Sequence, residues 1–321
     1  MKERIAALAR EIKTGYDGIR GKARAARAAD ASLAVPVSRS PVTGSVCAVD
    51  GGLLAQRMHG ADIVVVRAVG VNFIYQNSKL KTFSHHPSRS PQFEVELKNS
   101  LDEHGANAFR SLVRLRHELA CAVSMIEKFS PDALFIDGSL LPVPSDRPAD
   151  GSGLSTHYAE VLALYGKLVD SAKAKNCLLC GVIKDSRSRK LSERLGFSCS
   201  DSLLCNFLLD EGERTQAMPY FEANPPSKDL AALGKNISAF YLKPSKSDLP
   251  LRIELLGKEV DKAASLVCSL SSISENFAYP AVLVEADMCA ALDPREMEPI
   301  EGALLSLSGL RPLRRNSRPF R

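Results

Sequence analysis

The sequence contains no tryptophan and no long apolar run. Its 321 residues are 45% hydrophobic and 25% charged, which excludes disorder, collagen or coiled coil as a description of the whole chain. No apolar stretch approaches the roughly 18 to 20 residues that a transmembrane helix needs. Charges interrupt the apolar residues of the N-terminal segment MKERIAALAREIK, unlike those of a signal peptide. We therefore expect a soluble, cytoplasmic protein with no membrane partner.

Several catalytic signatures are missing as well. The chain has no G-x-x-x-x-G-K-[ST] loop, so we expect no ATP hydrolysis, and it has neither G-x-G-x-x-G nor G-x-S-x-G. A phosphatase of the haloacid-dehalogenase type needs Asp-x-Asp at its first strand, and Ala48 stands where the nucleophile would be. These absences exclude several common enzyme classes.

Cysteine and histidine give weak signals. The eight cysteines are scattered, and Cys177 with Cys180 forms the one C-x-x-C pair. A zinc site would need a second such pair, so we interpret the cysteines as reduced, buried thiols. His85 and His86 fall in a Ser/Pro-rich stretch, residues 85–91, which we predict to be a loop with both histidines on the surface.

Positive charge is concentrated at the C-terminus. Residues 311–321 hold five arginines and no acid, equal to the whole net charge of +5. Such a tail can contact the phosphates of nucleic acid or be a solvated terminus, and the sequence alone leaves both open. We predict an N-terminal helical arm (1–35), one α/β domain (36–305) and a basic tail (306–321).

Apolar periodicity predicts alternating helices and strands. An Ala-rich amphipathic helix covers residues 1 to about 30, and residues 141–155 are irregular. The predicted strands are 44–52, 61–75 (one strand, or two around Gly70), 133–138, 177–183, 236–242 and 251–256. The further predicted helices are 102–129, 158–175, 258–273 and the region from 280 onward.

Four acids stand out by their positions. Asp50 and Asp137 each end an apolar strand, Glu118 lies on the helix before the second of these strands, and Asp287 lies in the last helical region. Functional groups gather at the carboxyl ends of parallel strands, so we expect these side chains to converge. Clustered carboxylates repel one another unless a divalent cation lies among them. Taken singly, each Asp-Gly is also compatible with a simple turn.

The same residues resemble the NurA nuclease family from about residue 45 to residue 290. The resemblance is carried by Ala48-Val49-Asp50-Gly51-Gly52, by Leu134-Phe135-Ile136-Asp137-Gly138-Ser139-Leu140, and by Tyr279-Pro280 with an acid eight residues after the tyrosine. It implies a ribonuclease-H-like α/β fold with a central mixed β-sheet flanked by helices. It also implies a manganese-dependent single-strand endonuclease and 5′–3′ exonuclease that works as a homodimer with a HerA-type hexameric translocase in DNA end resection.

The resemblance also assigns roles to residues. Asp50, Glu118 and Asp137 would be metal ligands, and Tyr279 would belong to the active site. Where the family usually has histidine, this chain has Asp287. A carboxylate suits a hard cation, so Asp287 is retained as a fourth ligand for manganese, with magnesium as the alternative.

Basic residues follow the strand predicted at 177–183. Lys184 comes directly after it, and Arg187 and Arg189 follow within a few positions. Lysine binds a phosphate as a point charge, and arginine binds it through two parallel hydrogen bonds. We therefore predict that these three residues contact the phosphates of DNA. For the two arginines a solvated basic turn is an equal alternative.

Two other functions stay open at this point. The chain can be a catalytically weakened DNA-binding or scaffold subunit that regulates a translocase, which the change from histidine to Asp287 would favour. It can also be an unrelated metal-dependent phosphoesterase acting on small substrates.

Overall fold

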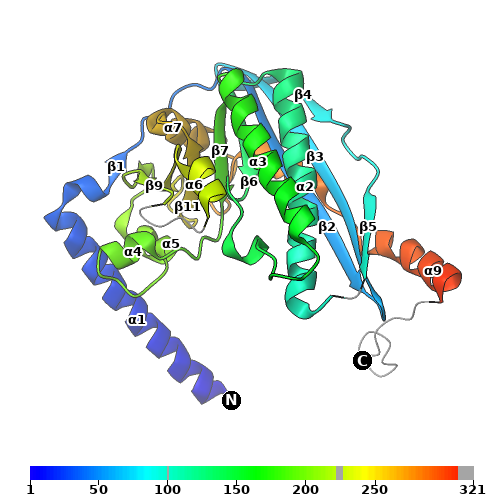
Figure 1. Ribbon diagram of the computed structural model, residues 1–321. Coiled ribbons are helices and arrows are strands. Elements are labelled where there is room, and N and C mark those ends of the chain that lie inside the picture. The colour runs from blue at the N-terminus through cyan, green and yellow to red at the C-terminus, as the bar shows by residue number, and fades with distance from the viewer. Residues whose placement is uncertain (100, 222–226, 310–321) are drawn as a thin grey trace. The chain divides into compact units, whose positions relative to one another are not determined.

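The computed structural model describes residues 1–99, 101–221 and 227–309 (Figure 1). The chain divides into two compact units. Unit 1 takes its described residues from 1–42, 180–224 and 235–281, and unit 2 from 43–179, 225–234 and 282–321. Among the described helices, none combines the length and the apolar character needed to cross a bilayer. The arginines predicted to form a basic tail, residues 311–321, lie outside the described residues.

Unit 2 contains a mixed β-sheet, as predicted. Its strands are β2 (Gly44–Arg57), β3 (Ala61–Gln76), β4 (Lys79–His86), β5 (Glu94–Asn99) and β6 (Ala133–Asp137). The strands β2, β3 and β4 pair antiparallel in that order, and β5 also pairs antiparallel with β3. The strand β6 runs parallel to β2. This parallel pair places the segment of β2 that precedes Asp50 beside the segment of β6 that precedes Asp137.

The described part of unit 2 also contains helices, of which α2 packs directly on the sheet. They are α2 (Glu103–Phe129), α3 (Ser155–Ala174), α6 (Lys228–Gly234), α8 (Ala281–Ala290) and α9 (Met297–Ser308), with short 3-10 turns η2 (Pro144–Asp146) and η3 (Pro294–Glu296). Asp102 caps α2 by accepting a hydrogen bond from the backbone N–H of Gly105 at 2.6 Å. The helix α2 contacts both β2 and β3, and α3 lies alongside α2 (Figure 1).

Two sequence predictions in unit 2 are wrong in detail, and one open alternative is decided. The strand β2 continues to Arg57, beyond its predicted end at Gly52, and β3 is a single strand, the first of the two alternatives. Gly70 does not break β3; a Cβ there would lie 2.4 Å from Sδ of Met125, so the glycine lets α2 approach. The stretch predicted as a loop begins in β4, which includes His85 and His86, and neither of these side chains is exposed.

Unit 1 has its own antiparallel strands and core. The strands are β1 (Val35–Pro36), β7 (Leu178–Ile183, which begins in unit 2), β8 (Glu213–Arg214), β9 (Met218–Pro219), β10 (Ile237–Lys243) and β11 (Leu251–Leu256). The helices are α1 (Lys2–Ala29), η1 (Ala31–Leu33), α4 (Lys190–Arg194), α5 (Asp201–Leu208) and α7 (Val260–Leu270). The strand β11 pairs with both β7 and β10.

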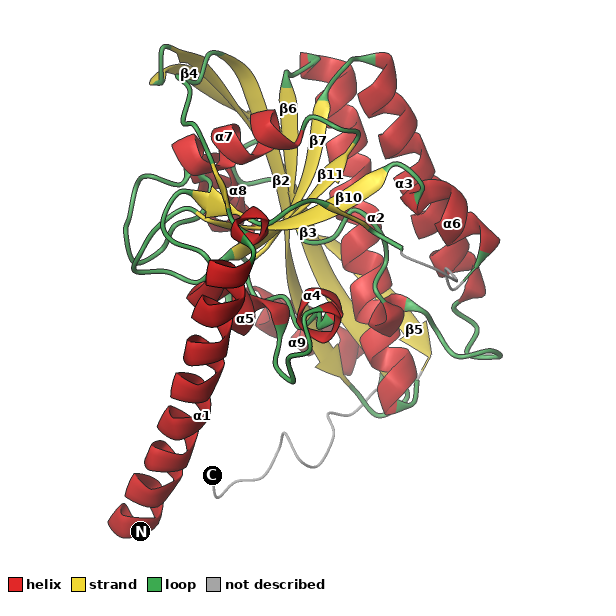
Figure 2. Cartoon of the chain, turned by 90° about the vertical axis from the view of Figure 1, so that its left-hand side faces the viewer, coloured by secondary structure: helices red, strands yellow, loops and turns green. Residues whose placement is uncertain are grey.

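The predicted N-terminal helix is present as one continuous helix, α1 (Figure 2). Its C-terminal part is anchored in unit 1, where Ala23 is fully buried and Arg27 Nη2 lies 2.7 Å from Glu213 Oε1. Its N-terminal part exposes Ile5 and Leu8. The domain boundaries proposed from the sequence stay predictions.

Candidate active site

Asp50 and Asp137 lie on neighbouring parallel strands of unit 2. The register pairs Val49 of β2 with Ile136 of β6, and each aspartate is the next residue along its strand. Asp50 is buried, with 6% of its surface exposed, because β2 continues beyond it instead of ending there. The pleat and the parallel register thus fix two carboxylates at one level of the sheet.

Glu118 reaches this position because Gly51 has no side chain. Glu118 is buried on the face of α2 that packs against the sheet. A Cβ on Gly51 would lie 2.6 Å from Glu118 Oε1, and one on Gly52 would lie 1.9 Å from the carbonyl oxygen of Ala290. The two glycines therefore serve the close approach of α2 and α8. The simple turn, which the sequence left open as an alternative, is not formed here.

Asp287 joins the group from α8. Its side chain is exposed, and it shares a hydrogen bond with the carboxyl group of Asp50. Asp50 also accepts a hydrogen bond from the backbone N–H of Gly51 at 2.7 Å. The structure therefore brings together all four acids singled out in the sequence: Asp50, Glu118, Asp137 and Asp287.

The electrostatics reflect this crowding. The pKa of Asp50 is raised from 3.8 to about 7, first by burial, then by the charge of Asp137 and the contact with Asp287. The pKa of Glu118 is raised to about 8, also mainly by burial, with Asp50 and Asp137 adding to the rise. Removing water and placing like charges together both disfavour the ionised form. At neutral pH the cluster therefore retains protons.

Arg114 is a member of the site that the sequence reasoning missed. Its Nη1 lies 2.9 Å from Glu118 Oε1, one helical turn away, and this contact lowers the pKa of Glu118. The charge of Glu118, followed by those of Asp50 and Asp137, raises the pKa of Arg114. The signal was present as an Arg–Glu pair at i and i+4 on one helix face.

The remaining predicted residues lie in unit 1. Lys184 directly follows β7, and its Nζ lies 4.3 Å from the centroid of the Tyr279 ring, a cation–π contact. Tyr279 is buried and donates a hydrogen bond from its hydroxyl to the carbonyl oxygen of Val182 at 3.2 Å. Arg187 and Arg189 are both exposed.

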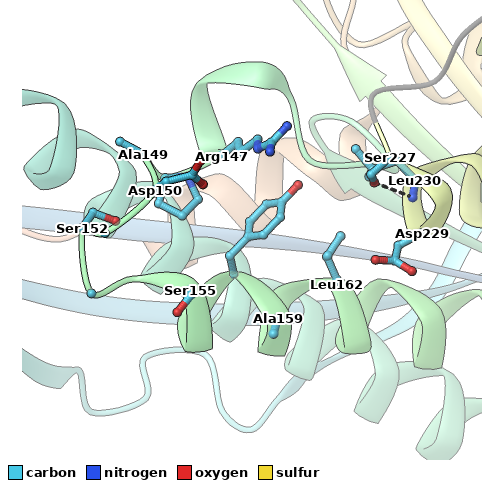
Figure 3. A pocket seen from close by; sticks show the side chains of 14 residues that line it. Arg147, Ala149, Asp150, Ser152, Ser155, Ala159, Leu162, Ser227, Asp229 and Leu230 are labelled. Carbon is cyan, nitrogen blue, oxygen red and sulfur yellow. Dashed lines mark hydrogen bonds between the residues drawn. The ribbon is translucent and has the colours of Figure 1, made fainter.

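Unit 2 also contains a cavity of about 560 Å³ (Figure 3). It lies between the first turns of α3, the loop 147–153 and the start of α6, and Arg147, Tyr158 and Asp229 supply polar groups. None of the predicted site residues lines it. The acid cluster and this cavity are therefore separate features.

A family model described as the NurA domain matches residues 44–292, which include all four acids. The chain belongs to the NurA family. This membership confirms the predicted family and the prediction of a nuclease. A search of curated proteins found no match.

Solved NurA structures share the fold. The NurA nuclease from Sulfolobus solfataricus is 18% identical, with a TM-score of 0.60 over 95% of this chain and 93% of that one. A NurA bound to dAMP and manganese is 11% identical, with a TM-score of 0.65 over 96% and 97%. A NurA with manganese is 12% identical, with a TM-score of 0.62 over 95% and 98%. These likenesses confirm the predicted NurA-type α/β fold with a central mixed sheet flanked by helices. The manganese in two of these structures agrees with the predicted cofactor.

Proposed function

We propose that this NurA protein is a divalent-metal-dependent deoxyribonuclease whose metal ligands are Asp50, Glu118, Asp137 and Asp287. The observation that carries the proposal is the convergence of four carboxyl groups in unit 2, two of them buried with strongly raised pKa values. Such an arrangement is unfavourable in the protein alone, and a divalent cation among the oxygens relieves it.

The donor set fits manganese or magnesium. All four side chains offer carboxylate oxygens, which are hard ligands, and none of them offers sulfur or imidazole. The replacement of the family's usual histidine by Asp287 makes the set more suited to a hard cation. The manganese bound in two NurA structures of the same fold supports manganese as the cofactor here.

A bound divalent cation supplies a polarised phosphate and an activated water for hydrolysis of the phosphodiester. The chain's own groups prepare that position. Burial and the neighbouring acids raise the pKa of Asp50, so its proton must leave before the carboxylate can act as a ligand. Arg114 opposes the rise in the pKa of Glu118 and so favours its ionised form. Lys184, held over the ring of Tyr279, is proposed to bind a phosphate of the DNA, with Arg187 and Arg189 contacting flanking phosphates.

The finer aspects of the function rest on family membership. They are single-strand endonuclease and 5′–3′ exonuclease activity, action with a HerA-type hexameric translocase in DNA end resection, and a homodimer. The exposed apolar side chains Ile5, Leu8 and Ile12 on α1 support self-association. Light scattering distinguishes a dimer from the 34.7 kDa chain.

The deciding experiment is cleavage of labelled single-stranded DNA with manganese, magnesium or chelator. We expect cleavage with manganese, and a loss of about a hundredfold or more in Asp50→Asn and Asp137→Asn, because metal ligation is worth several kcal/mol of transition-state stabilisation. Asp170→Asn, at an exposed position of α3, is the matched control and should cleave like the wild type. Full activity in Asp50→Asn would refute the proposed ligand set.

A weakened scaffold subunit is the second candidate, favoured by Asp287 where the family usually has histidine. In that case the wild type binds DNA and cleaves none of it under any metal, and Asp287→His gains cleavage. Hydrolysis of small nucleotide esters without cleavage of DNA would instead favour the phosphoesterase alternative.

A further inference from the structure

The helix α8 carries a second set of metal-ligand side chains on another face. Glu285 and Cys289 are one helical turn apart and therefore share a face, while Asp287 lies two residues from each, about 200° around the helix. His85, from strand β4, meets this second face. Its Nε2 lies 3.1 Å from Glu285 Oε1, and Sγ of Cys289 lies 3.4 Å from the same oxygen.

We propose that His85, Glu285 and Cys289 form a second metal site, which binds a zinc-class divalent ion. The ligand atoms of the three side chains all lie within 4.8 Å of one another. Within residues 1–99, 101–221 and 227–309, this is the only group of three or more His, Cys, Asp or Glu side chains that meets this distance. Donors at the corners of a zinc tetrahedron lie roughly 3.3–3.7 Å apart, as the zinc bond lengths require. The two measured separations are close to that range without rearrangement of the backbone.

The chemistry of the donors distinguishes this site from the carboxylate cluster. Imidazole and thiolate are ligands for zinc, whereas manganese and magnesium prefer the oxygens of the cluster. His85 and Cys289 are about nine-tenths buried, and Glu285 is 24% exposed, so a fourth position remains open to water. The rings of Phe83 and His85 pack in a T-shaped arrangement with their centroids 5.7 Å apart, which restricts the orientation of the imidazole.

An ordinary ion pair is the competing explanation. His85 and Glu285 alone would satisfy it, and Nη2 of Arg89 lies 3.9 Å from Glu285 Oε1. An ion pair does not require a thiol, yet Cys289 directs its sulfur at the same carboxylate oxygen. Arg89 is 74% exposed, so its side chain can move into solvent when a cation enters. Without a metal, the thiol of Cys289 donates a hydrogen bond to Glu285 Oε1 across one helical turn. A metal would instead place all three side chains around one ion.

The site would join β4 to α8 within unit 2. A metal held by one residue of the strand and two of the helix fixes how far α8 is rotated about its axis. That rotation determines where Asp287, on the other face, meets Asp50. The effect on Asp287 rests on the proposed function, whereas the proposal of the metal site itself does not.

Cobalt absorption spectroscopy on the full chain tests the site, with Co²⁺ as the spectroscopic substitute for zinc. We expect a thiolate-to-cobalt charge-transfer band in the near ultraviolet for the wild type, at one equivalent of cobalt. The band should vanish in Cys289→Ser and persist in Cys121→Ser, the control for a partly exposed thiol elsewhere in unit 2. It should also persist in Asp50→Asn, which removes a proposed catalytic ligand and so keeps this test independent of nuclease activity.

His85→Gln provides a second variant that leaves the thiol in place. This substitution should weaken zinc binding by more than the 10–100-fold that an outer-shell change produces. Competition with a chelator measures the zinc affinity. If Cys289→Ser fails to fold, this variant decides. Absence of the band in the wild type, its persistence in Cys289→Ser, or unchanged zinc affinity in His85→Gln would each overturn the proposal.

Discussion

Replacing Asp50 by asparagine should stabilise the metal-free protein at alkaline pH. The amide keeps the shape of the carboxyl group, can accept the hydrogen bond from Gly51 and cannot ionise. In the wild type the pKa of Asp50 is raised from 3.8 to about 7. A folded-state pKa above the unfolded value means that the carboxyl group favours folding fully below about pH 4, and that this contribution is lost as the pH rises to about 7.

The size of the effect follows from the same shift. Each pKa unit corresponds to about 1.4 kcal/mol, so ionisation of Asp50 removes up to about 4 kcal/mol from the free energy of unfolding by pH 8. We expect Asp50→Asn to be more stable than the wild type by about 2–4 kcal/mol at pH 8 in chelator, and nearly equal to it at pH 4.

Urea unfolding at several pH values, with chelator or with manganese, measures this difference. Manganese should reverse the order, because it binds the wild type more tightly and stabilises the folded state by mass action. Asp170→Asn, at an exposed position, should show no pH-dependent gain. If Asp50→Asn is no more stable than the wild type at pH 8 in chelator, the reasoning about buried charge is wrong.

Three further predictions follow from the same contacts. Gly52→Ala would place a Cβ 1.9 Å from the carbonyl oxygen of Ala290, so it should lower the free energy of unfolding by about 1–3 kcal/mol. Gly18→Ala, in open space on α1, should raise the free energy of unfolding by about 0.5–1 kcal/mol. Equal urea midpoints for the two variants would contradict the packing. Tyr279→Phe removes the hydrogen bond to Val182 and should cost about 0.5–1.5 kcal/mol, again by urea unfolding, and an unchanged midpoint would show that the bond contributes nothing. Manganese affinity, measured by calorimetry, should increase as the pH rises through 7 to 8, because the raised pKa values of the acids make metal and protons compete; a pH-independent affinity would exclude this competition.

Much of unit 2 was predictable because its signals are local. The β-branched run of β3 and the apolar stripe of α2 follow periodicities that burial on one face imposes, and Asp102 and Ser130 mark the ends of α2. The order of the acids along the chain was enough to expect that they meet. The parallel pairing of β2 with β6 then places Asp50 and Asp137 together.

Other features depend on contacts between distant segments and were therefore missed. The sequence left a turn at Gly51 and Gly52 open, because the approach of α2 and α8 that requires glycine there is revealed by no local pattern. His85 was expected on the surface of a loop because Ser and Pro follow it. Its pairing with Glu285 joins residues 200 positions apart. Arg114 was overlooked although its spacing from Glu118 was visible.

The long pairing of β2 with β3 ties two distant places in unit 2 to a single alignment. It extends from Gly44 opposite Tyr75 to Arg57 opposite Asp62. Near its far end, Ile63 and Val65 pack with Met297 at the start of α9. A slip of one residue would turn every side chain to the opposite face. A register shift between β2 and β3 would therefore disrupt the packing against α9 and turn the Asp50 side chain away from the other acids. Native packing of α9 thus implies that Asp50 is correctly oriented.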